Sequence, residues 1–128
     1  MIRTNTNTEL EFLSIPVLNP GKSFEALLSR ATSPENILID VIPDDTLRDT
    51  CDLRSSDGVV IDRGITKPHT GGDYYLIQHG DLRQIRQIMT MADNIYSVNS
   101  DHSHDLLCRD AVQVIGKVIG SVKVRAIN

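Results

Sequence analysis

Short runs of β-branched and other apolar residues recur along this chain, and residues typical of turns separate them. Runs of this length and composition predict strands. We predict extended segments over 10–18, 36–42, 58–62, 73–78, 82–88, 94–99 and 111–127. Because short glycine-containing turns separate several of them, the pattern predicts a mostly β domain built on a curved antiparallel sheet.

The segment 82–88 is less regular than the others. Its apolar residues Leu82, Ile85 and Ile88 lie three apart, a spacing that alone favours a helix. The turn at Gly80-Asp81, however, would join the segment to the preceding strand as a β-hairpin. We therefore predict a strand here as well.

Glycines and a helical pattern add detail to this picture. Gly116 and Gly120 interrupt the last apolar run, which predicts bulges or bends there. Apolar residues share one face over 24–31 after Ser23, a suitable N-cap, so we expect one or two short helices. The Thr- and Asn-rich residues 1–9 are predicted to form a flexible tail, and 10–128 a single domain.

Composition narrows the class of protein. The chain has 128 residues, of which 40% are hydrophobic and 23% charged, enough for one compact core. Its net charge of −4 argues against nucleic-acid binding by this chain alone, because phosphate binding needs a clustered basic face. Cys51 and Cys108 show no metal-ligand spacing, and no apolar run resembles a membrane span or a signal peptide. We expect a cytoplasmic protein with no membrane contact.

Four segments stand out for their order along the chain. They are "SSDGVVIDRGIT" at 55–66, "GDYYLIQHGDLRQIRQI" at 72–88, "YSVNSDHS" at 96–103 and "DAVQVIGKVIGSVKV" at 110–124. Together they resemble the C-terminal domain shared by LexA, UmuD and lambdoid phage repressors. The resemblance implies a curved antiparallel β-domain of the LexA and signal-peptidase type.

The resemblance also implies a chemistry from which this chain departs. In the family a serine nucleophile, activated by a neutral lysine, cuts an Ala-Gly or Cys-Gly bond of its own chain. Here "PDDTLRD" at 43–49 takes the place of the nucleophile segment, with Thr46 closest to the serine. Arg86 takes the place of the lysine, and the sequence contains neither cleavable dipeptide.

Arg86 is the most consequential of these departures. A guanidinium remains protonated at any relevant pH, so it cannot act as a general base. We expect a catalytically degenerate site in which Arg86 pairs with Asp45, Asp49 or their neighbour Asp44. The alternative is that Arg86 points into solvent.

These features predict a non-cleaving oligomerisation domain of a phage-type transcriptional repressor. Its partners would be further copies of itself and an antirepressor protein, and DNA would be bound only through a separate N-terminal domain. We expect self-association through the β-rich segment 111–126 and apolar surface near 73–78. The candidate interface residues are Val112, Val114, Ile115, Val118, Val122 and Val124.

Two other functions remain open from the sequence. One is an active serine–lysine autoprotease in which Lys67 or Lys117 supplies the base; the other is an unrelated small β adaptor that binds another protein. The segment 101–105, "DHSHD", has metal-ligand residue types, but a polar loop is favoured because no distant ligand cluster accompanies it. We expect no cofactor and no metal.

Overall fold

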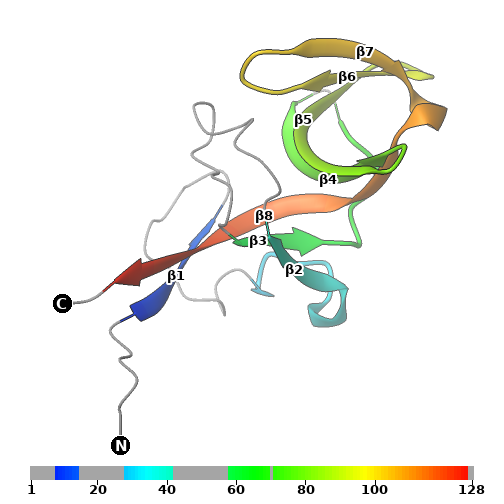
Figure 1. The fold of residues 1–128 in the computed structure, drawn as a ribbon. Helices are drawn as coiled ribbons and strands as arrows, with labels where there is room; N and C mark the ends of the chain where they lie inside the picture. The colour runs from blue at the N-terminus through cyan, green and yellow to red at the C-terminus, as the bar shows by residue number, and fades with distance from the viewer. Residues whose placement is uncertain (1–7, 15–27, 42–57, 70, 127–128) are drawn as a thin grey trace, which may run out of the picture.

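The structure is a computed structural model that describes residues 8–14, 28–41, 58–69 and 71–126. These residues form an antiparallel sheet with the strand order β2-β3-β8-β4-β5-β6-β7, and β1 also pairs with β8 (Figure 1). The strands are β1 (Thr8–Ser14), β2 (Ile37–Val41), β3 (Gly58–Asp62), β4 (Asp73–His79), β5 (Leu82–Ala92), β6 (Ile95–Asn99), β7 (His104–Cys108) and β8 (Gln113–Ala126). Two 3-10 turns complete the described part, η1 (Pro34–Asn36) and η2 (Arg109–Ala111). The predicted mostly β, antiparallel fold is confirmed.

The long strand β8 pairs with three other strands. It pairs with β4 near its start and with β3 and β1 farther along (Figure 1). The register against β4 shifts beside Gly116, and the register against β3 shifts beside Gly120, as predicted from the glycines. At Gly116 a Cβ would lie only 2.6 Å from the carbonyl oxygen of Asp62, so β8 and β3 approach too closely there for a side chain.

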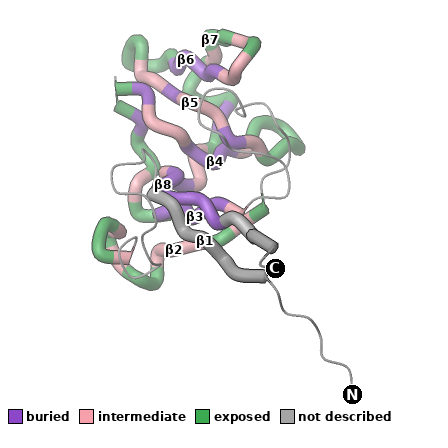
Figure 2. The backbone as a smooth tube through the Cα atoms, turned by 90° about the vertical axis from the view of Figure 1, so that its left-hand side faces the viewer, coloured by how far each residue is buried: buried purple, intermediate pink, exposed green. Residues whose placement is uncertain are grey.

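Buried residues lie mainly on β3, β4, β5, β6 and β8 (Figure 2), and the apolar ones form three clusters. The first core cluster comprises Val59, Ile61, Leu76, Ile85 and Val118. The second comprises Tyr75, Ile77, Ile88, Tyr96, Val98 and Val112, and the third comprises Val60, Ile119 and Val122. Because successive residues of a strand point to opposite faces, β4 contributes alternately to the first two clusters.

The hairpin of β4 and β5 forms as predicted. Gly80 and Asp81 make its two-residue turn, and Gly80 has a φ of +62°, a conformation that glycine adopts without strain. The three-residue spacing in β5 arises because Ile85 packs into the first cluster and Ile88 into the second, on the opposite face. β5 continues to Ala92, beyond the predicted end at 88, because its last residues pair with β6.

Three segments differ from the prediction or lie partly outside the described residues. β1 begins at Thr8, so Thr8 and Glu9 pair with β8 although the sequence placed them in the tail. Strand β7 was not predicted. The expected helix over 24–31 falls mostly outside the described residues; within them, the Ala31 N–H donates to the Leu28 carbonyl in a single turn. No helix of the described part is long and apolar enough to span a membrane.

Candidate functional site

Four polar side chains lie in one row across β3, β8, β4 and β5. Asp62 is paired with Lys117, Lys117 with Tyr75, and Tyr75 with Arg86. Directly paired residues of antiparallel strands point to the same face, so the four share one side of the sheet. Arg86 is the residue that stands at the lysine position in the family resemblance.

Arg86 is half-buried, and its Nη1 donates a hydrogen bond of 2.7 Å to the Ile85 carbonyl oxygen. A guanidinium has five donors and no acceptor, so it supplies charge and hydrogen bonds but takes no proton. Thr46 and the expected carboxylate partners Asp44, Asp45 and Asp49 lie outside the described residues. The ion pair with Arg86 therefore stays a prediction.

Of the two lysines considered as alternative bases, Lys117 lies in this row and Lys67 lies outside it. Lys117 Nζ lies 3.4 Å from Asp73 Oδ2, so the lysine forms an ion pair with a carboxylate of β4. Lys67 lines a shallow cavity of about 210 Å³ together with His69 and Ile65.

Asp62 has a structural role at the end of β3. Its side chain is fully buried and accepts hydrogen bonds from Thr32 N (2.7 Å), Thr32 Oγ1 (2.8 Å) and Gly64 N (2.9 Å). Burial alone would raise the pKa of Asp62, but these bonds and the charge of Lys117 lower it below its ordinary value of 3.8. The carboxylate thus fastens the segment before β2 to the sheet.

Tyr75 occupies the centre of the row. The residue is fully buried, and its hydroxyl has no hydrogen-bond partner among the described residues. Burial, with a contribution from Asp73, raises the pKa of Tyr75 to about 12, and the nearby backbone of His69 opposes the rise only in part. The phenol therefore remains neutral at physiological pH.

A second polar group, missed by the sequence analysis, joins β6 to β7. Asn99 is buried; its amide group exchanges hydrogen bonds with Ser97 Oγ, and its Oδ1 lies 3.0 Å from His104 Nδ1. His104 begins β7, so only the first part of 101–105 is a loop. Among the described residues no group of three His, Cys, Asp or Glu side chains is placed to hold a metal ion.

The predicted interface residues whose side chains are described are buried or half-buried within the single chain. Val112, Val118 and Val122 are buried, Val114 and Ile115 are half-buried, and the side chain of Val124 is outside the described part. The surface expected near 73–78 is also internal, since the middle of β4 fills the core. The physical reason is that β8 and β4 are inner strands with neighbours on both sides.

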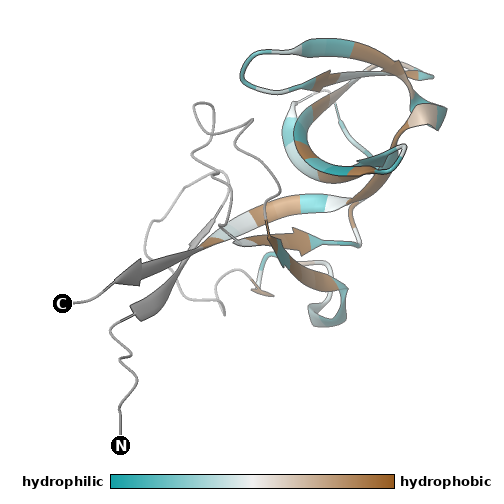
Figure 3. Cartoon of the chain, in the orientation of Figure 1, coloured by the Kyte–Doolittle hydropathy of each residue, from teal (hydrophilic) through white to brown (hydrophobic). Residues whose placement is uncertain are grey.

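Exposed apolar side chains are found on β2 and β7, and also on β5 (Leu82, Met91) and β6 (Ile95). Ile39 and Val41 on β2 are 51% and 63% exposed, and Leu106 on β7 is 68% exposed. β2 and β7 are the two ends of the strand order. Figure 3 shows β2 as a mainly hydrophobic strand at the margin of the sheet. No periodicity in the sequence distinguishes such an edge strand from an inner one.

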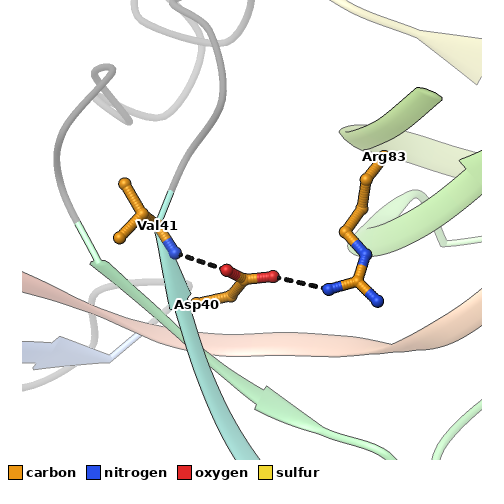
Figure 4. A network of polar contacts seen from close by, with 3 residues as sticks. All are labelled: Asp40, Val41 and Arg83. Carbon is orange, nitrogen blue, oxygen red and sulfur yellow. Dashed lines mark hydrogen bonds and ion pairs between the residues drawn. The ribbon is translucent and has the colours of Figure 1, made fainter.

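A polar contact fixes the end of β2 (Figure 4). Asp40 Oδ1 accepts a hydrogen bond of 2.8 Å from the backbone N–H of Val41. Asp40 Oδ2 lies 2.9 Å from Arg83 Nη1 on β5. The Asp40 carboxylate therefore binds two groups at once: the backbone N–H of Val41 on β2 and the guanidinium of Arg83 on β5.

The described row combines two cations, one hydrogen-bonded carboxylate and one buried phenol. The strands at the two ends of the order, β2 and β7, carry exposed apolar side chains. A comparison with models of protein families finds no match to this chain, and a comparison with curated protein sequences finds none either.

Proposed function

We propose that this chain is a self-association module of a phage-type transcriptional repressor and that it does not cleave itself. Copies joined through this domain would bring two separate DNA-binding parts together, which raises affinity for paired half-sites. An antirepressor protein would reverse this state in the cytoplasm by binding the module. The resemblance in the order of the four sequence segments motivates the repressor context.

The exposure of Ile39 and Val41 on an edge strand carries the proposal. An edge strand presents unpaired backbone donors and acceptors, and natural proteins usually protect such edges with charges, prolines or a covering segment. Among the described residues β2 pairs with β3 alone, and it carries two large exposed apolar side chains in addition to the charge of Asp40. Such an edge is suited to pairing with another strand.

Arg86 supports the non-cleaving part of the proposal. The guanidinium occupies the row beside Tyr75, where the resemblance would require a proton acceptor. Lys117, the nearest lysine in that row, is already paired with Asp73. This arrangement supports the proposal that the domain does not cleave itself.

Sedimentation equilibrium of the full chain tests self-association. From about 5 to about 500 µM, a dissociation constant in the micromolar range shifts most of the chain from monomer to dimer. We expect the weight-average mass to rise toward twice the chain mass and to fall again on dilution. A constant monomer mass over the whole range would contradict the proposed function.

A further inference from the structure

We infer that the partner of β2 is β2 of a second copy, in an antiparallel pair with Ile39 opposite Ile39. The inference rests on the proposed self-association and specifies where it occurs. The pair would join the two sheets into one continuous sheet around a two-fold axis, the commonest symmetry of protein dimers.

The backbone of β2 determines which residues can bond to a new strand. The Arg63 N–H donates to the Asn36 carbonyl oxygen at 2.9 Å. Asn36 and Arg63 therefore form a hydrogen-bonded pair, next to the pair of Ile37 with Asp62 in the register. Hydrogen-bonded pairs alternate along an antiparallel ladder. Residues 38 and 40 therefore direct their backbone groups toward β3. Three residues direct theirs to the outer edge: Ile37, Ile39 and Val41.

These three outward residues also share one face of the sheet. Their side chains are all apolar, and two of the three are exposed. With Ile39 opposite Ile39, Ile37 of each copy stands opposite Val41 of the other. All three outward positions are then hydrogen-bonded pairs, and every pair on this face is apolar.

The charge of Asp40 distinguishes this register from its neighbours. In the preferred register Asp40 stands opposite Leu38 of the second copy. A shift that places Ile39 opposite Val41 would set Asp40 directly opposite Asp40, and like charges in that position are destabilising. The opposite shift pairs Ile37 with Ile39 but leaves Val41 without a partner.

Asp40 also restrains the pairing that we infer. Its carboxylate accepts the hydrogen bond of the Val41 N–H, which is one of the outward donors. A second strand must displace this carboxylate before it can bond to Val41. Arg83 contacts the other oxygen of the same carboxylate. Asp40 is therefore already held in place within each copy before two copies pair.

The resulting contact is small and the association should be weak and reversible. A five-residue strand pair buries less than the roughly 1,200 Å² that stable complexes of standard size bury. A weak contact is sufficient when a separate domain of each copy binds a neighbouring half-site, because the second binding event is then intramolecular.

Three variants of the full chain, compared with the unchanged chain by sedimentation equilibrium, test the inference. Ile39→Lys adds a charge to the centre of the pair and should weaken the dimer by about tenfold or more. Leu106→Lys is the matched control, because it changes a still more exposed apolar residue on β7, at the other end of the strand order. It should alter the dissociation constant by less than about twofold. Asp40→Ala frees the Val41 donor and should strengthen the dimer by about fivefold.

The outcomes separate the inference from the proposed function. If Ile39→Lys dimerises like the unchanged chain while Leu106→Lys does not, self-association stands and the inferred site is wrong. A weaker dimer in Asp40→Ala would contradict the restraint and the register. If the unchanged chain is a monomer throughout, both the proposed function and the inference fail.

Discussion

Arg83 on β5 and Asp40 on β2 form an ion pair of 2.9 Å although β3, β8 and β4 separate their strands in the sheet. The sheet therefore curls far enough to bring its outer strand against an inner one. The first core cluster fills the space inside this curl, where Leu38 of β2 and Ile85 of β5 pack against the same group of side chains.

The ion pair itself should contribute little to stability. The side chains of Arg83 and Asp40 are 51% and 30% exposed, and exposed pairs are screened by water and salt. Arg83→Ala should lower the free energy of unfolding by less than about 1 kcal/mol, and the difference should shrink in high salt. Urea denaturation at low and high salt measures both; a larger effect that is insensitive to salt would be inconsistent with a surface pair.

Asp62 should be far more important for stability than the exposed pair. Asp62→Ala leaves buried backbone donors without a partner, so we expect a loss of about 3 kcal/mol in urea denaturation. Thr32→Val is the matched control, because it removes one of the three hydrogen bonds and should cost about 1 kcal/mol. Equal effects of the two variants would contradict the geometry around the carboxylate.

The contribution of Asp62 should also depend on pH. Its pKa in the folded chain is lowered from 3.8, so the stability that it supplies is present in full above that value. That stability is lost as the pH falls through the lower, folded pKa. The difference in unfolding free energy between the unchanged chain and Asp62→Ala should therefore be constant near neutrality and shrink in acid. A difference that grows in acid would show that the pKa is raised instead.

Tyr75→Phe should be tolerated and could stabilise the fold. The variant keeps the ring in the second cluster and removes a buried hydroxyl that has no partner among the described residues. We expect a change within about 1 kcal/mol at neutral pH, in the stabilising direction. A loss of more than about 2 kcal/mol would show that the hydroxyl has a partner after all.

Alkaline pH provides an independent test of the same residue. The pKa of Tyr75 is raised from 10 to about 12, so the unfolded chain releases this proton more readily than the folded one. Stability should fall as the pH rises from 10 toward 12, and Tyr75→Phe should lose less. Thermal unfolding across this range measures the difference.

The chain should remain intact under conditions that favour self-cleavage. Alkaline incubation deprotonates a catalytic lysine, but Arg86 remains charged and no Ala-Gly or Cys-Gly bond is present. Intact-mass measurement after several hours should show a single species, both for the unchanged chain and for Arg86→Lys. A defined pair of fragments from the unchanged chain would favour the autoprotease alternative.

The sequence predicted well those features of the strands that depend only on neighbouring residues. The hairpin at Gly80 and the bends at Gly116 and Gly120 follow from backbone properties of glycine, which need no knowledge of the rest of the fold. β7 was missed because only Leu107 of this strand packs toward the core, so its alternation looks like a polar loop.

The candidate surface was harder to predict, because strand order is a property of the whole sheet. The valines of 111–126 are typical of an exposed β interface and equally of a central strand. Only the pairing of β8 with β1, β3 and β4 identifies it as an inner strand, on which Val118 and Val122 are buried. In the same way, nothing local marks Ile39 and Val41 as residues of an edge.

Amide hydrogen exchange, followed residue by residue at low and high protein concentration, tests pairing through β2 most directly. The amides of Leu38 and Asp40 face β3 and should be protected at both concentrations. The Ile39 amide faces outward, so it should exchange rapidly in the monomer and become protected as the dimer forms. An Ile39 amide whose exchange stays rapid at concentrations where the chain is demonstrably dimeric would contradict pairing through β2.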